Sequence, residues 1–237
     1  RFLSQRLGLR LPEPVEQTED VEPLVLPGRG LERMQLQQAV VEALDGGHEA
    51  GLRQRLRARA LLPSGALGER QFEALLAQAR PFAQARRDWL AGEATMSERF
   101  QVDIDGQQLH GRVADLHPRG LVRLRADAVN GNAALRWGLD WLLANAAGAG
   151  VPLVQFHDGG DGPGPHVIDA LDPAQARDAL RQLLALYADG QREPLPFAPY
   201  TGWDIWNAEP GKRRAAGWRR WHGDGNGGWA EGDSEAI

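Results

Sequence analysis

The chain has 237 residues and a formal net charge of −5, with 42% apolar and 25% charged residues, which suits one sizeable α/β domain or a domain with an appendage. The absence of cysteine excludes a disulfide framework and thiolate metal sites, and no pattern indicates a membrane span or a signal peptide. The acidic balance argues against a generic polyanion binder, so any nucleic-acid contact must come from local basic patches. We expect a cytoplasmic protein and, because the sequence starts at Arg1 rather than Met, a piece of a longer one.

The first ninety residues predict a connector followed by helices. Residues 1–30 are rich in proline and acidic residues and are interpreted as an extended segment. Apolar residues then recur at helical spacing over 31–44, and a short basic helix is expected over about 50–60. After a turn at 63–65, a longer amphipathic helix is expected to end near residue 90.

The pattern then changes from helical spacing to alternation. Residues 100–104 and 109–113 alternate between apolar and polar around an Asp-Gly turn at 105–106, which is typical of a β-hairpin. A second turn at 118–120 precedes a third strand, expected over 121–125. The sequence therefore predicts a β-meander.

The second half predicts further helices around one buried strand. Asn132 is expected to cap a helix that glycines close, and residues 151–156 form a buried strand followed by a glycine-rich loop over 157–165. Asp172-Pro173 is a typical start for another helix. The prolines between 194 and 199 indicate another extended connector.

This order of elements predicts a mixed α/β fold with a small sheet flanked by helices. We assign residues 31–200 to one domain and residues 201–237 to a C-terminal extension rich in tryptophan and arginine.

Short segments resemble the C-terminal region of the RecC family in order and spacing. They are Phe2–Leu9, Glu22–Leu26, Gly30–Leu36, Leu62–Glu69 and Phe72-Glu73. The resemblance is densest over residues 1–90, looser through the meander and the helix after Asp172, and weak in the tail. It implies a degenerate PD-(D/E)XK, or restriction-endonuclease-like, nuclease fold, because that region resembles the nuclease domain of RecB.

Active members of that nuclease group hold Mg²⁺ with carboxylates from adjacent strands and use a lysine. The resemblance places Glu69 where they carry a histidine, and Ala114 where a Gly-Arg-Ile-Asp strand carries its aspartate. Asp115 is adjacent, but strict alternation would direct it to the opposite face. Arg125 and Asp127 stand where the third strand carries its second carboxylate and its lysine. We therefore expect an inactive nuclease with no catalytic residues and no metal.

The glycine-rich loop carries residue types that bind metals, namely His157, Asp158, Asp161 and His166. A metal site requires these side chains to converge. Loops of this composition are more often solvated turns, which is the interpretation we favour here.

Two groups of basic residues are candidate DNA contacts. In the tail they are Lys212, Arg213, Arg214, Arg219 and Arg220, interleaved with Trp218 and Trp221. In the meander they are Arg112, Arg119 and Arg123, with Arg125 nearby. For the tail we favour the alternative, in which the tryptophans pack inward or meet a partner subunit. For the meander, DNA contact and a solvated surface weigh equally.

The resemblance implies a non-catalytic, structural and DNA-guiding domain of the RecC subunit of RecBCD (exodeoxyribonuclease V), a helicase–nuclease that acts in double-strand break repair by homologous recombination. It implies RecB and RecD as partners, docking against RecB, and contact with or splitting of duplex DNA ends and forks. ATP and Mg²⁺ chemistry would reside in the partner subunits, and the sequence contains no GxxxxGK[ST] phosphate loop. A strand-splitting element is guessed near Asp105 or at 117–120.

Two alternatives come from other classes of protein. An active Mg²⁺-dependent nuclease with a migrated site would require Asp103, Asp115 and Asp127 to converge. A pure protein-interaction module would make no DNA contact.

Overall fold

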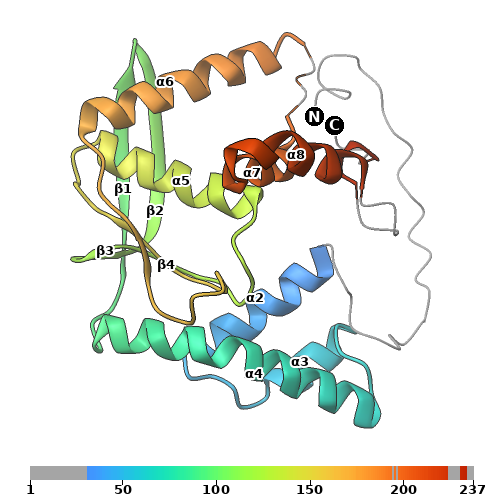
Figure 1. Ribbon diagram of the computed structural model, residues 1–237. Helices are drawn as coiled ribbons and strands as arrows, with labels where there is room; N and C mark the ends of the chain where they lie inside the picture. Colours follow the sequence, from blue (N-terminus) through green and yellow to red (C-terminus); the bar gives the residue numbers. More distant parts are fainter. Residues whose placement is uncertain (1–30, 194, 196, 224–229, 234–237) are drawn as a thin grey trace.

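The computed structural model describes residues 31–193, 195, 197–223 and 230–233 (Figure 1). The extended segment expected over residues 1–30 lies outside the described residues. Helices α2 (Leu31–Asp45), α3 (Leu52–Ala58) and α4 (Gly65–Leu90) follow in chain order, which confirms the three helices that apolar spacing predicted. Their buried residues pack together in one cluster that includes Leu36, Leu44, Leu56, Phe72 and Leu76.

A small mixed sheet follows the helices, in the order β1-β2-β3-β4-β5. Its strands are β1 (Met96–Ile104), β2 (Gln107–His117), β3 (Gly120–Leu124), β4 (Leu153–Phe156) and β5 (His166–Ile168). Pairing is antiparallel except between β3 and β4, which are parallel. The predicted meander and buried strand are confirmed, whereas β5 was not predicted. The α/β class with a small mixed sheet is therefore confirmed.

Helices cover both faces of the central strands. Val122 and Val154 pack with Leu90 of α4, while Leu121 and Leu153 pack against α5 (Gly131–Ala146) on the other face. Figure 1 shows α4 below β3 and β4 and α5 above them, with α6 (Pro173–Gly190) beyond α5. Successive side chains along β3 and β4 point to opposite faces of the sheet. Because apolar side chains lie on both faces, these strands are buried on both sides.

The caps of these helices are partly as predicted. The side chain of Asp172 accepts a hydrogen bond from the Ala174 amide at 2.8 Å, which confirms it as the cap of α6. The cap expected at Asn132 is wrong: Asn130 caps α5 by accepting from the Ala133 amide at 3.0 Å. Asn132 instead donates to the hydroxyl of Tyr200, so it joins α5 to the helix α7 (Pro199–Asn207).

Two further helices lie where the sequence suggested a connector and a tail. Pro199 begins α7 (Pro199–Asn207), because its fixed φ and missing amide hydrogen suit the first turn of a helix. The chain continues into α8 (Arg213–His222), which packs on α7. Within the described part of the chain, no helix is both long and apolar enough to cross a membrane.

Candidate functional site: a cleft around Arg123

A bulge interrupts β2 beside the position where the nuclease resemblance places a metal ligand. Glu98 pairs with Val113 and Met96 with Leu116, so a step of two residues along β1 spans three along β2. Asp115 takes up the extra residue in the left-handed region, with φ 59°. The bulge interrupts the strict alternation along β2, and the Asp115 carboxylate lines a cleft and contacts Arg123.

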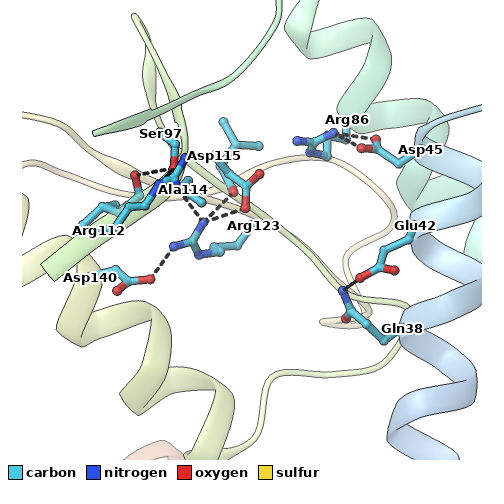
Figure 2. Close-up of polar contacts among 12 residues, drawn as sticks. Gln38, Glu42, Asp45, Arg86, Ser97, Arg112, Ala114, Asp115, Arg123 and Asp140 are labelled. Carbon is cyan, nitrogen blue, oxygen red and sulfur yellow. Dashed lines mark hydrogen bonds and ion pairs between the residues drawn. The ribbon is translucent and has the colours of Figure 1, made fainter. Parts of the chain in front are cut away.

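This cleft has a volume of about 510 Å³ and lies between two groups of helices. Glu42 of α2 and Arg86 of α4 line one side, and Asp140 of α5 lines the other. Asp115 of β2 and Arg123 of β3 lie on the sheet between them (Figure 2). Charged residues of both signs therefore face the same space from the helices and the sheet.

Among these charged residues, Arg123 makes the most hydrogen bonds, and its side chain is 9% exposed. Its Nη1 donates to the Ala114 carbonyl oxygen at 2.9 Å and to Asp115 Oδ2 at 3.0 Å. Its Nη2 donates to Asp140 Oδ2 at 2.5 Å. A buried charge is tolerated only when it is paired and hydrogen-bonded, and two carboxylates here share one guanidinium.

A second ion pair, between Arg86 and Asp45, lines the cleft on the side of α2 and α4. The Nη1 atom of the buried Arg86 lies 2.5 Å from both carboxylate oxygens of Asp45, at the end of α2. Arg87 donates to the Leu44 carbonyl oxygen. These contacts join α4 to the C-terminal turn of α2, so they hold the helical wall of the cleft in place.

Of the other residues singled out by the nuclease resemblance, one lines the cleft and two have contacts elsewhere. Glu69 forms an exposed ion pair with Arg53 of α3 at 2.5 Å and does not line the cleft. Asp127 accepts hydrogen bonds from Gln37 of α2 and Gln78 of α4. Arg125 lines the cleft directly after β3. The structure therefore brings Arg125 to the cleft with Asp115 and Arg123, while Glu69 lies elsewhere and Asp127 is bound by the two glutamines.

The carboxylates of the alternative, migrated metal site do not converge. Asp103 accepts from the Gly106 amide and the Gln108 side chain at the β1–β2 turn, whereas Asp115 and Asp127 have the separate partners given above. Among the residues that the structure describes, no three His, Asp or Glu side chains come close enough together to hold a metal ion.

A histidine of the glycine-rich loop stacks on the first residue of β5. The ring centroids of His157 and His166 lie 4.3 Å apart, and Asp158 accepts from the Gly160 amide. Burial, followed by the neighbouring His166, lowers the pKa of His157 below its usual range. The loop therefore contains a turn, as favoured from its composition, and one histidine that resists protonation.

The arginines of the meander do not form one surface. Arg112 is exposed and its Nε donates to the Ser97 hydroxyl at 2.9 Å. Arg119, in the turn before β3, lies over the Trp89 ring at 4.1 Å, a cation–π contact. Arg123 is buried, and both of its terminal nitrogens are hydrogen-bonded. Arg112 and Arg119 thus remain at the surface, whereas Arg123 belongs to the cleft.

Helix α8 presents a basic surface with an exposed tryptophan. Trp218 is 67% exposed and lies beside His222, so the inward packing considered for it is wrong. Arg214 and Arg219 line a shallow groove with Trp218. Arg220 instead pairs with Asp204 of α7 at 2.7 Å, and Lys212 pairs with Glu209 at 2.8 Å. We call Arg213, Arg214, Trp218 and Arg219 the α8 surface; within the described residues, none of its arginines has a carboxylate partner.

Three residues with clear structural contacts had weak signals in the sequence or none. Arg136 and Asp140 are the charged residues of α5, and their spacing of four places both on one helical face, which lines the cleft. Glu231 is 3% exposed and accepts from the Tyr200 and Thr201 amides at 3.1 Å and 2.6 Å. It therefore caps α7 from a distant part of the chain, which no local pattern reveals.

Comparisons with known proteins agree with one another. The family description "RecC C-terminal domain" matches residues 1–210. The "RecBCD enzyme subunit RecC" of Mycolicibacterium smegmatis is 30% identical over 206 residues, which cover 83% of this chain and 18% of that protein. The chain thus spans about a fifth of the length of that relative, and α8 lies beyond the residues that match the family.

Proposed function

The chain belongs to the RecC C-terminal domain family, as its sequence motifs predicted, and on this basis we propose that it is a non-catalytic, DNA-guiding part of a RecC subunit. In this proposal it is a degenerate PD-(D/E)XK nuclease domain. It docks against RecB within a complex that also contains RecD, and it contacts or splits duplex DNA at ends and forks. ATP hydrolysis and Mg²⁺-dependent cleavage are left to the partner subunits, and the complex acts in the cytoplasm in recombinational repair.

The observation that carries the non-catalytic assignment is the position of Arg123. A metal-dependent nuclease needs carboxylate oxygens that are free to bind Mg²⁺. Here Asp115 and Asp140 are both bound to one buried guanidinium, so these residues do not fit a metal ion beside it. A lysine that could stabilise a departing oxygen is also missing, because Lys212 is the only lysine of the chain and lies outside the cleft.

The basic surfaces support a contact with DNA. The α8 surface combines an exposed indole ring with arginines that have no carboxylate partner in the part of the chain that the structure describes. Phosphate-contacting arginines beside an aromatic ring are the usual elements of single-strand and fork binding. Arg112 and Arg119 add positive charge at the meander.

A nuclease assay tests the non-catalytic part of the proposal. The 237-residue chain is incubated with linear and forked DNA in Mg²⁺ or Mn²⁺, and we expect no cleavage above the level of a buffer control. Cleavage that Asp115→Asn abolishes would overturn the proposal, because it would show that the cleft is an active site.

Fork binding at increasing salt concentration tests the DNA-guiding part. Reversing Arg213 and Arg214 to glutamate should weaken binding and reduce its salt dependence by about one unit of slope for each phosphate that the variant no longer neutralises. Arg192→Glu, compared with Arg214→Glu alone, is the matched control, because Arg192 is exposed just after α6 and pairs with Asp189. Equal weakening in both variants, or binding that does not depend on salt, would contradict a specific role for the α8 surface.

A second candidate function, a protein-interaction module without DNA contact, is favoured by the exposed tryptophans. Trp206 and Trp218 are 74% and 67% exposed, and exposed tryptophans are typical of surfaces that bind partners. RecB binding that Trp218→Ala abolishes, with no measurable fork binding by the unmodified chain, would favour this second function.

A further inference from the structure

We propose that the guanidinium of Arg123 is a built-in cation that takes the place of a divalent metal ion, and that removing it converts its surroundings into a Mg²⁺ or Mn²⁺ site. The inference rests on the proposed non-catalytic role of the same cleft. It goes further by assigning Arg123 a specific role: its guanidinium occupies the position between two carboxylates where a divalent cation would bind in its absence.

The atoms around Arg123 are those that a hard divalent cation prefers. Nη1 is surrounded by the carbonyl oxygens of Ala114 at 2.9 Å and Val122 at 3.4 Å and by Asp115 Oδ2 at 3.0 Å. Nη2 contacts Asp140 Oδ2 at 2.5 Å. Mg²⁺ is usually held by one or two carboxylates and completes its shell with water. The oxygen donors around Arg123 therefore match such a site in type and in charge.

The surroundings also leave room for a hydrated ion. Arg123 lines the cleft of about 510 Å³, which is open to solvent. The side chains of Asp115 and Asp140 are 48% and 40% exposed, so they are free to move toward an ion smaller than a guanidinium. The Ala114 carbonyl oxygen, which accepts from Arg123, belongs to the backbone at the bulge of β2.

The charges explain why Arg123 differs from the other buried arginine of the cleft. Arg123 faces two carboxylates, so its removal leaves two negative charges that repel each other until a cation replaces it. Arg86 faces Asp45 alone, so its removal leaves a single carboxylate. Arg86→Ala is therefore a matched control: it also deletes a buried arginine from an ion pair, but it creates no paired carboxylates.

The test measures Mn²⁺ binding by isothermal titration calorimetry and by the decrease of the free Mn²⁺ signal in electron paramagnetic resonance, on the 237-residue chain. We expect Arg123→Ala to bind one Mn²⁺ per chain, and the unmodified chain and Arg86→Ala to bind none in the cleft. The Tm of Arg123→Ala should be lowered in EDTA and should rise by roughly 5 to 8 °C when Mn²⁺ is present at about one hundred times its Kd. Adding Asp115→Asn and Asp140→Asn to Arg123→Ala should abolish both effects.

A folded Arg123→Ala that binds no Mn²⁺, or a triple variant that binds it equally well, overturns the inference. If Arg123→Ala does not fold in EDTA, recovery of its fold in Mn²⁺ supports the inference. If it does not fold in Mn²⁺ either, Arg123→Gln takes its place with the same expectations, and its failure to fold or to bind Mn²⁺ overturns the inference. DNA cleavage by the unmodified chain bears on the proposed function alone, so the two failures are distinguishable.

Discussion

The contact between Glu231 and the start of α7 predicts a large effect from a single substitution. The buried carboxylate accepts from two amides, those of Tyr200 and Thr201, in the first turn of α7. Hydrogen bonds to a charged group contribute about 1.5–3 kcal/mol each, and a negative charge at a helix N-terminus contributes about 0.3–1 kcal/mol. Because these terms are not additive, we expect Glu231→Ala to destabilise the contact by roughly 2–4 kcal/mol.

Two variants separate the carboxylate charge from other effects. Glu231→Gln keeps one oxygen acceptor but loses the charge, so we expect about half of the alanine effect. Asp233 lies with Glu231 in a short 3₁₀ helix (Glu231–Asp233), and its side chain is exposed. We expect Asp233→Asn to change the free energy of unfolding by less than about 0.5 kcal/mol. This comparison isolates the two amide contacts from any general effect of changing an acidic residue in this segment.

The assay combines urea unfolding, followed by tryptophan fluorescence, with hydrogen exchange of the Tyr200 and Thr201 amides. Faster exchange without a shift of the urea midpoint would mean that α7 and α8 open locally while the rest stays folded. Because this contact positions the α8 surface, Glu231→Ala should also weaken fork binding under the proposed function. If both amides of Glu231→Ala exchange as in the unmodified chain and its urea midpoint matches that of Asp233→Asn, the Glu231 carboxylate does not stabilise α7.

Two other predictions concern a half-buried histidine and a crowded glycine. The pKa of His157 is lowered by burial and then by His166, so unfolding restores a proton-binding group; stability should be constant above the ordinary value of 6.5 and fall as the pH drops below it. His157→Gln should flatten this decline in Tm, and an unchanged slope would contradict it. At Gly131, an added Cβ would lie 1.9 Å from the Pro199 carbonyl oxygen, so Gly131→Ala should cost about 2 kcal/mol or more. Gly138→Ala, in the same helix with nothing within 4 Å, should instead stabilise by about 0.5–1 kcal/mol; both are measured by urea unfolding.

Elements with strong local signals could be predicted from the sequence. The long helix α4 follows from apolar spacing, the β1–β2 hairpin from Asp105-Gly106, and the start of α6 from Asp172-Pro173. Each of these signals depends on residues that are close together in the chain. The three-residue strand β5 was missed because, among the described strands, it pairs with β4 alone, and such short strands have no periodicity of their own.

The central contacts of the cleft could not be predicted, for a related physical reason. Whether Asp115 faces the cleft depends on one extra residue in the pairing of β2 with β1, and no residue in that run requires a bulge. Asp140 reaches Arg123 only because α5 packs across the sheet. The charge pair at i and i+4 on α5 showed that this helical face is polar, but it could not identify the partner.

The contacts of Arg123 give a different reason to expect that the cleft is inactive. From the sequence, inactivity followed from alanine at position 114, where a metal ligand was expected. In the structure, the carboxylates of Asp115, next to that position, and of Asp140 both bind the guanidinium of Arg123, so two acidic side chains are present in the cleft. Under the proposed function, the difference from a metal site is then the positive charge of Arg123, which satisfies both carboxylates from within the chain. A missing ligand would require a new carboxylate to restore metal binding, whereas an occupying cation requires only its removal, and the Arg123→Ala experiment distinguishes between these two explanations.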